Sequence, residues 1–169
     1  VFGADRPDSG ALQLDGQPVV VKNPRDAIEK GICLLTEDRK GQGLIIGQTV
    51  RENFGLPNLR SFGRWGFIDK TRETEALQVR AKQLQVKFTG SEQIIATLSG
   101  GNQQKIALAK WLERDAEVII FDEPTRGIDV GAKYEIYRLM NNLAAEGKAI
   151  LMISSELPEV LGMSDRIIV

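Results

Sequence analysis

The sequence contains no histidine and only one cysteine, and these two scarcities exclude several kinds of site. Without histidine the chain can form no imidazole-based zinc site, no Ser-His-Asp triad and no imidazole proton shuttle. Cys33, as the one cysteine, cannot form a disulfide within the chain, which is compatible with a reducing compartment.

Long apolar runs and an excess of positive charge are also lacking. The apolar runs at residues 118–121 and 149–153, which are among the longest, are far shorter than the ~18–20 residues that span a bilayer, and we interpret them as buried strands. Lys and Arg number 22 against 23 for Asp and Glu. The basic excess that holds nucleic acid electrostatically is therefore absent, and we expect no nucleic-acid partner.

The beginning of the sequence lacks two further features. Residues 1–10 include Asp5, Arg6 and Asp8, a composition that argues against a signal peptide. The first residue is Val1 rather than methionine, from which we expect the chain to be a fragment.

The rest of the composition is typical of a globular protein. Apolar residues make up 42% and charged residues 27% of the 169 residues, which excludes disorder, collagen and coiled coil as the main class. The length fits one domain, or one domain with a lobe.

The last third of the sequence, residues 115–169, alternates between strand and helix patterns. Strands are predicted at 117–121, 148–154 and 166–169, and helices at 130–145 and 158–162. Strands separated by helices indicate βαβ units, and hence a parallel sheet with right-handed crossovers.

The first segment, residues 1–41, combines a hairpin with a short helix and a strand. Asp15-Gly16 predicts a hairpin turn within residues 11–21. Asn23 is a suitable N-cap and Pro24 a suitable first residue for a short helix, which a strand at residues 32–36 follows.

The middle segment, residues 42–114, predicts a mostly helical lobe. Residues 42–66 carry five glycines and are interpreted as loops around one short helix near residues 50–56. Longer helices are predicted at residues 70–86 and 100–114.

Two carboxylates, Asp122 and Glu123, follow directly after the apolar run at residues 118–121. The carboxyl ends of parallel strands are where open α/β sheets bind ligands. Adjacent acids repel, so a cation or hydrogen-bond donors should lie near them. Asp122 suits Mg²⁺, and Glu123 could orient or deprotonate a water molecule. A strand that ends in an acidic turn is the other interpretation.

A second candidate site is the start of the helix predicted at residues 100–114. Ser99 is a good N-cap, and Gly100-Gly101 leave the backbone bare at the helix N-terminus, which can hold a phosphate. The alternative is an ordinary capped helix, although two glycines in a first turn are poor helix formers.

These residues resemble the motifs of ATP-binding-cassette (ABC) ATPases. Residues 98–103 resemble the signature motif, residues 118–123 the Walker B strand with its catalytic glutamate, and residues 125–131 the D-loop region. More narrowly, residues 37–40, 122–133 and 154–169 resemble the second, C-terminal cassette of the fused double ATPases that drive bacterial ribose, galactose or xylose uptake.

The resemblance implies an α/β fold. Its parts are a parallel-sheet P-loop NTPase core, a small antiparallel β segment and an inserted α-helical lobe. The expected division is core at residues 1–41 with the Q-loop, helical subdomain at residues 42–114 ending in the signature helix, and core at residues 115–169 with Walker B, D-loop and switch region.

The phosphate-binding loop of the family, G-x-x-x-x-G-K-[ST] or Walker A, occurs nowhere in the sequence. The one Gly-Lys pair, Gly147-Lys148, lacks the preceding glycine and is followed by Ala149. In the family this loop and the aromatic residue that stacks on adenine precede the segment matching residues 1–10. We therefore expect an incomplete core without its phosphate-loop strand, which would leave apolar sheet surface uncovered.

Two further positions depart from the family pattern. Glu37 stands where the family has the Q-loop glutamine, and Ser155 stands where it has the switch histidine. Glu37 keeps an oxygen for metal or water but adds negative charge near phosphates. Ser155 keeps a donor but is shorter and cannot become cationic, so its stabilisation of a γ-phosphate should be weaker.

The resemblance assigns roles to individual residues. The catalytic residues implied are Glu123 and Ser155, and Mg²⁺ is expected at Asp122 and Glu37. The nucleotide-binding residues implied are Ser99, Gly100, Gly101, Asn102, Gln103, Glu37 and Asp129, with ATP as the ligand. Asp129 is expected to couple two sites across a cassette interface, or to cap the helix at residues 130–145, or both.

The function implied is that of an ATP-binding and ATP-hydrolysing subunit, here a fragment, of an ABC importer for a simple sugar. The chain would donate its signature motif to a partner, the first ATPase cassette of the same or a second chain. It would contact a membrane permease subunit and, indirectly, a periplasmic sugar-binding protein. Its expected place is the cytoplasm, peripheral on the inner face of the bacterial cell membrane.

Two other functions are weighed against this one. A regulatory or structural cassette without turnover of its own is favoured by Glu37 and Ser155, whereas the intact Asp122-Glu123 pair argues against it. A soluble ABC protein of DNA repair or translation ranks last, because the roughly 60 residues between Glu37 and Leu98 leave no room for a long coiled-coil insertion.

Three smaller features have local interpretations. Arg39 and Lys40 are interpreted as part of a solvated loop, and Cys33 as a core residue. The aromatic residues after Glu37 could form a local core or meet a coupling helix of the permease; they are Phe54, Phe62, Trp65 and Phe67.

Overall fold

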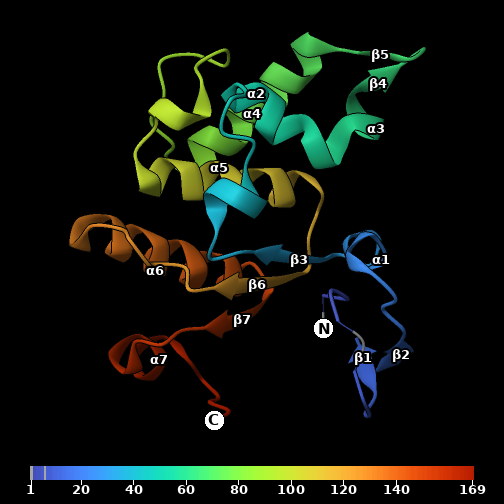
Figure 1. The fold of residues 1–169 in the computed structure, drawn as a ribbon, viewed down its shortest axis with the longest axis vertical. Helices are drawn as coiled ribbons and strands as arrows, with labels where there is room; N and C mark the ends of the chain where they lie inside the picture. Colours follow the sequence, from blue (N-terminus) through green and yellow to red (C-terminus); the bar gives the residue numbers. More distant parts are fainter. Residues whose placement is uncertain (1, 6) are drawn as a thin grey trace.

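A three-stranded parallel sheet forms the centre of the computed structural model, which describes residues 2–5 and 7–169 (Figure 1). Strands β3 (Ile32–Leu35), β6 (Val118–Asp122) and β7 (Ala149–Ile153) pair in the order β3-β6-β7. In the register, Ile119 lies between Cys33 and Ile150. The predicted parallel sheet is confirmed, and Cys33 is buried in it.

The N-terminal segment forms the predicted hairpin and helix; Val1 and Arg6 lie outside the described residues. Strands β1 (Leu12–Leu14) and β2 (Gln17–Val19) are antiparallel. Asp15 and Gly16 both have positive φ, +50° and +74°, as a tight two-residue turn requires. Helix α1 (Pro24–Glu29) begins where Asn23 accepts a hydrogen bond from the Asp26 amide at 3.0 Å.

Residues 39–113 form a helical lobe that lies above the sheet in Figure 1. Its elements are a π-helical turn η1 (Arg39–Gly43), α2 (Val50–Gly55), a 3-10 turn η2 (Leu56–Asn58), α3 (Leu59–Phe62), a hairpin of β4 (Gly63–Arg64) and β5 (Phe67–Ile68), α4 (Lys70–Gln83), a 3-10 turn η3 (Ile95–Thr97) and α5 (Gly100–Glu113). The predicted long helices are confirmed. The prediction of loops around one short helix was incomplete, because burial of Asn58 and Phe62 orders further turns there.

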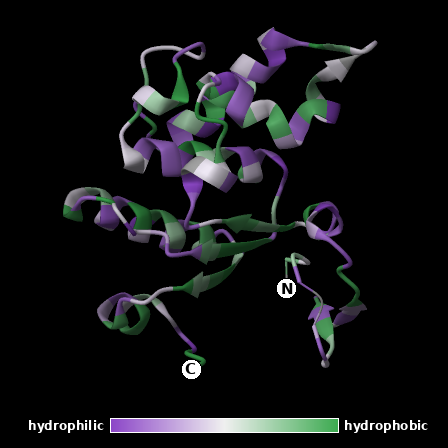
Figure 2. Cartoon of the chain, in the orientation of Figure 1, coloured by the Kyte–Doolittle hydropathy of each residue, from purple (hydrophilic) through white to green (hydrophobic). Residues whose placement is uncertain are grey.

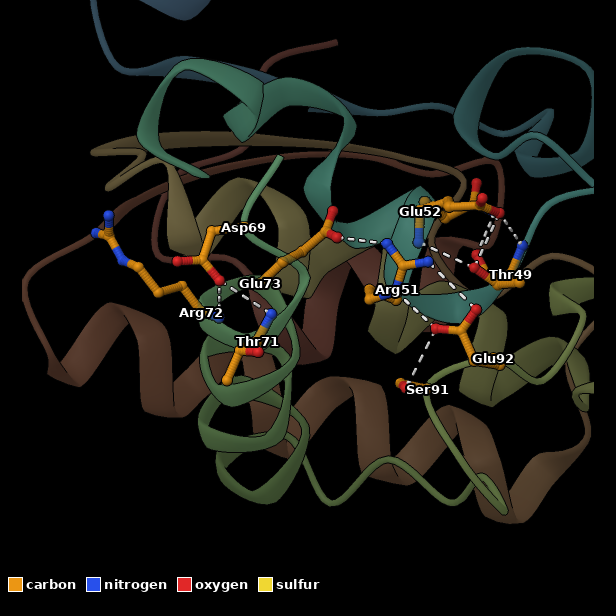
Figure 3. Close-up of polar contacts among 10 residues, drawn as sticks. Thr49, Arg51, Glu52, Asp69, Thr71, Arg72, Glu73, Ser91 and Glu92 are labelled. Carbon is orange, nitrogen blue, oxygen red and sulfur yellow. Dashed lines mark hydrogen bonds and ion pairs between the residues drawn. The ribbon is translucent and has the colours of Figure 1, made fainter. Parts of the chain in front are cut away.

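A buried ion network joins the elements of the helical lobe (Figure 3). The Arg51 side chain on α2 is 6% exposed, and its Nη1 lies 2.6 Å from Glu73 Oε2 on α4. Its Nε lies 2.6 Å from Glu92 Oε1, in the loop after α4. A Cβ at Gly55 would lie 1.7 Å from Glu73 Oε1, so the carboxylate occupies the space that only glycine leaves.

The hydrophobic core runs from the lobe into the sheet through α5. This helix buries most of its residues and packs against α2 and α4 on one side and β3 and α6 (Val130–Ala145) on the other. Figure 2 shows apolar colour concentrated along the three sheet strands. No helix in the described part of the chain is both long and apolar enough to cross a bilayer.

The C-terminal residues differ from the prediction. Helix α7 (Leu157–Met163) forms as expected, but the strand predicted at residues 166–169 was wrong, since those residues have no regular secondary structure and are exposed. A strand needs a neighbour for its backbone hydrogen bonds. Among the described strands, β7 has only β6 beside it, and no strand lies at its outer edge for the C-terminal residues to join or extend.

Candidate functional site

The ends of β6 and β7 bring Glu123 and Ser155 into direct contact. The strands are parallel and Asp122 is in register with Ile153, so the residues that follow them leave the sheet together. The Glu123 amide donates to the Ile153 carbonyl at 2.9 Å. The Ser155 amide donates to Glu123 Oε1 at 2.8 Å. The two residues predicted to be catalytic are therefore neighbours, joined through the Ser155 backbone rather than through its hydroxyl.

Glu123 adopts a backbone conformation that side chains disfavour. Its φ is +47°, in the left-handed region, which costs a non-glycine residue about 1–2 kcal/mol. The hydrogen bonds to Ile153 and Ser155 help to hold it there. These contacts hold the Glu123 carboxylate at the end of β6 and limit its movement with the loop that follows.

The acidic pair at the end of β6 fits a magnesium nucleotide better than a free ion. Within residues 2–5 and 7–169, no three acidic or thiol side chains cluster as a metal site would need. Mg²⁺ is commonly held by one or two carboxylates together with substrate phosphates and water. Asp122 is half-buried at the strand end and has no ion-pair partner in the described part of the chain, so it suits that use.

Glu37 is engaged by a different partner. It forms an ion pair with Arg126, in the loop that follows Glu123. Both side chains remain substantially exposed, at 44% and 65%. The sequence predicted Glu37 as a ligand for metal and nucleotide and did not predict this contact, which occupies one of its oxygens.

The start of α5 is a capped and accessible helix end. Ser99 Oγ accepts hydrogen bonds from the Asn102 amide at 3.4 Å and from Asn102 Nδ2 at 3.0 Å. Asn102 Oδ1 accepts from the Lys87 amide at 2.8 Å, which ties the helix end to the preceding loop. Ser99 is exposed and Gly100 and Gly101 are half-buried, so the first turn is within reach of a second molecule.

Gly101 also marks the place where α5 approaches α6. A Cβ at this position would lie 3.2 Å from the Cβ of Ala132. Glycine therefore serves close helix packing here as well as exposure of the backbone.

Gln103 lies behind the helix end rather than at it. The residue is 4% exposed, and its Nε2 donates to the carbonyls of Ile95 and Leu98 at 3.1 and 3.2 Å. The side-chain nitrogen of Gln103 thus binds the turn η3 and the residue after it, which precede the helix. This placement gives Gln103 a supporting position, unlike that of Ser99.

Arg39 was interpreted as part of a solvated loop, and this was wrong. Its Nη1 donates to the Gly100 carbonyl at 3.3 Å and its Nη2 to the Arg126 carbonyl at 3.4 Å. Burial lowers the pKa of this guanidinium. One side chain from η1 therefore links the start of α5 to the loop after Glu123. The signal for it was its position just beyond the end of β3, at the ligand-binding edge of the sheet.

Asp129 caps α6, as one of its two predicted roles required. The carboxylate accepts a hydrogen bond from the Ala132 amide at 3.0 Å. The cap is confirmed, whereas a role across a cassette interface stays a prediction.

Sequence reasoning missed a buried carboxylate next to this site. Glu159 on α7 is 5% exposed and accepts hydrogen bonds from Thr125 Oγ1, at 3.0 Å, and from Ser154 Oγ. The available signal was a glutamate in the first turn of a short helix that begins two residues after Ser155.

The aromatic residues after Glu37 divide between two environments. Phe54 and Phe62 are buried, with ring centroids 6.1 Å apart, so they form a local core. Trp65 and Phe67 are 89% and 80% exposed on the hairpin of β4 and β5. Nearby, an open groove of about 390 Å³ lies between α1 and the lobe; residues lining it include Arg25, Ile28, Leu56, Leu59, Arg60 and Arg114.

The sequence profile of the ABC transporter family matches residues 1–126, and the chain belongs to that family. Within it, the chain is 52% identical over all 169 residues to the ribose import ATP-binding protein RbsA of Bacillus subtilis. It is also 52% identical over 169 residues to a putative ribose/galactose/methyl galactoside import ATP-binding protein of Rhizobium etli. The chain spans about a third of these relatives, 34% and 32% of their lengths.

Solved structures agree on the fold. A nucleotide-free ATP-binding cassette from an ABC transporter matches with a TM-score of 0.79 and 21% identity, over 97% of this chain and 66% of that one. A dimeric ATP-binding cassette in a post-hydrolysis state, bound to ADP and phosphate, matches with a TM-score of 0.69 and 22% identity, over 91% of this chain and 66% of that one.

Proposed function

We propose that this chain is part of the ATP-binding, ATP-hydrolysing subunit of an ABC importer for a simple sugar. The observation that carries the proposal is the contact of Glu123 with Ser155 beside Asp122, at the carboxyl end of a parallel sheet. The similarity to ribose and galactose import ATP-binding proteins supports a sugar as the transported substrate.

The proposed reaction is transfer of the terminal phosphoryl group of ATP to water. Asp122 would hold Mg²⁺, which when bound neutralises charge on the phosphates. Glu123 would orient the attacking water and accept its proton, because only its Oε1 has a hydrogen-bond partner among the described residues. Ser155 would hold Glu123 in place through its amide.

The start of α5 would serve a second nucleotide, held by a partner cassette. Ser99 and the amides of Gly100, Gly101 and Asn102 lie at a helix N-terminus, where partial positive charge favours a phosphate. Gln103 would support this turn from behind, and Asp129 would lie at the partner interface. The dimeric ATP-binding cassette among the similar structures supports such a pairing.

The lobe surface would dock on the membrane permease. Trp65 and Phe67 are exposed on a hairpin, and the groove beside α1 is lined by four apolar residues, three arginines and Glu29. Exposed aromatic residues gathered on one surface are typical of interaction sites. The chain would then lie peripherally on the cytoplasmic face of the membrane, with a periplasmic sugar-binding protein as an indirect partner.

A second function, a regulatory cassette without turnover, is favoured by one observation. One oxygen of Glu37 is paired with Arg126 and is therefore not free for a metal or water. In that case the chain would keep its signature role toward the partner and contribute no hydrolysis of its own.

ATPase assays on the complete protein, reconstituted with its permease in liposomes, distinguish the two functions. Glu123→Gln keeps the acceptor for the Ser155 amide but removes the base, so we expect kcat to fall about 100-fold or more with binding of ATP retained. Glu117→Gln, at the other end of β6, is the matched control, and its kcat should equal that of the wild type. Equal rates for all three proteins would assign the chain to the regulatory function.

A further inference from the structure

Glu159 connects the two segments that hold Glu123. One oxygen accepts from Thr125 Oγ1, two residues after Glu123, at 3.0 Å. The other accepts from Ser154 Oγ, in the residue before Ser155. We propose that Glu159 is a positioning residue for Glu123, an inference that rests on the proposed ATPase function.

The contacts close a ring around the end of the sheet. Glu123 is bonded to the Ser155 amide, Ser154 to Glu159, Glu159 to Thr125, and Thr125 through the chain back to Glu123. Each bond in the ring limits the movement of the next. The left-handed φ of Glu123 means that release of the ring would favour relaxation of this residue away from its present place.

The environment of Glu159 makes a purely surface role untenable. Glu159 and Thr125 are 5% and 1% exposed, and burying a carboxylate is costly unless its oxygens are well satisfied. Its two hydroxyl donors, Thr125 and Ser154, follow the ends of β6 and β7. The buried carboxylate therefore holds the loops after both strands in place. The carboxylate comes from helix α7, which lies below β7 in Figure 1.

Neighbouring charges do not share this arrangement. Glu156, in the same turn, forms an ion pair with Lys133 at 2.6 Å and is exposed. Glu156→Ala is therefore a matched control, because it removes a carboxylate from the same turn whose side chain contacts neither Thr125 nor Ser154. The hydrogen bond from the Glu156 amide to Ser154 Oγ, at 3.0 Å, is retained in this variant.

Kinetics of the complete, reconstituted protein test the inference. We expect Glu159→Ala to lower kcat about tenfold or more while KM for ATP changes less than about twofold, since a displaced base slows chemistry without weakening binding. Glu159→Gln should keep kcat within about threefold of the wild type, because an amide and two rotatable hydroxyls can still form both hydrogen bonds. The Thr125→Val/Ser154→Ala double variant should match Glu159→Ala, and combining all three should cause no further loss.

Amide hydrogen exchange supplies a readout that does not need turnover. In Glu159→Ala the peptide covering residues 153–157 should exchange at least about tenfold faster, with peptides of α6 unchanged, whereas Glu156→Ala should leave both as in the wild type. Wild-type exchange at residues 153–157 in Glu159→Ala, or a kcat equal to that of the wild type, would overturn the inference. An equal loss in Glu159→Gln, or faster exchange throughout α6, would also overturn it.

Failure of the proposed function would appear differently. Suppose that the wild type hydrolyses no ATP, while Glu159→Ala still speeds amide exchange at residues 153–157. ATPase activity of this chain would then be rejected, whereas the structural role of Glu159 in holding the two loops would stand.

Discussion

Two groups of charged side chains in this chain are arranged in opposite ways. In the helical lobe, Arg51 is buried and fully paired with Glu73 and Glu92 (Figure 3). At the end of β6, Asp122 and Glu123 stand side by side, and no cation pairs with either in the residues that the structure describes. The first group lies beside α5, which packs against α2 and α4, whereas the second lies at the end of a sheet strand.

Under the proposed function, the first group of charges stabilises the fold and the second would bind a ligand. A buried charged side chain whose partners lie within the chain is not available to bind another molecule. Adjacent carboxylates without a cation repel each other, and a bound metal nucleotide would relieve that repulsion. We therefore expect changes in the lobe to act on stability and changes at the strand end to act on turnover.

Among the variants that test this comparison, Arg51→Met should have the largest effect on stability. It removes the cation and leaves Glu73 buried without a partner, which we expect to lower the free energy of unfolding by about 4 kcal/mol. Arg80→Met, which breaks the more exposed pair with Glu113, is the control and should cost under about 1 kcal/mol. Denaturant unfolding measures both. A loss below that of the control would show that the lobe network is not what stabilises the fold.

Lys110 is an intermediate case, a buried charge in the lobe whose partners are the Gly43 carbonyl and the ring of Trp111. Burial lowers its pKa from 10.5 to about 8. Between these values the unfolded chain holds a proton that the folded chain has lost, so stability should rise with pH across this window, by at most about 3 kcal/mol. Burial raises the pKa of Cys33 from 9.0 to about 12, which opposes the rise above pH 9.

Comparison with Lys110→Met isolates the lysine, because both proteins keep Cys33. The unfolding free energy of the wild type minus that of the variant should increase steadily from pH 8 to 10.5. A difference that stays constant over this range would mean that the lysine is not desolvated.

A smaller effect is expected at Arg39, which links the two regions. Arg39→Lys keeps the charge but cannot reach both the Gly100 and Arg126 carbonyls, so we expect a loss of about 1 kcal/mol in stability. Arg39→Met should show nearly the same loss in thermal unfolding. If Arg39→Lys were as stable as the wild type, the positive charge alone would explain the contribution of Arg39 to stability, and its two hydrogen bonds to Gly100 and Arg126 would not be needed.

The sequence predicted the elements that depend on local patterns. The Asp15-Gly16 turn, the Asn23 cap and the α6 periodicity are local signals, and each formed where expected. The strand predicted at residues 166–169 failed because a strand depends on a neighbour that no local pattern reveals.

The site was predictable where motifs are contiguous and missed where contacts are distant. Asp122 and Glu123 are consecutive, and Ser155 joins them through the parallel register of β6 and β7. The contacts of Arg39 with Gly100 and Arg126 and of Glu159 with Thr125 connect residues 34–87 positions apart. Such contacts are set by tertiary packing, for which this sequence carried only weak signals.

The central claim, that the start of α5 meets a phosphate held by a partner, is tested most directly by comparing Ser99→Asp with Ser99→Asn. Both residues cap helices about as well as serine, so both variants should unfold like the wild type. Only aspartate places a negative charge beside the phosphate, and we expect it to lower the ATPase rate of the complete protein at least about tenfold relative to Ser99→Asn. Equal ATPase rates for the two variants would contradict the account.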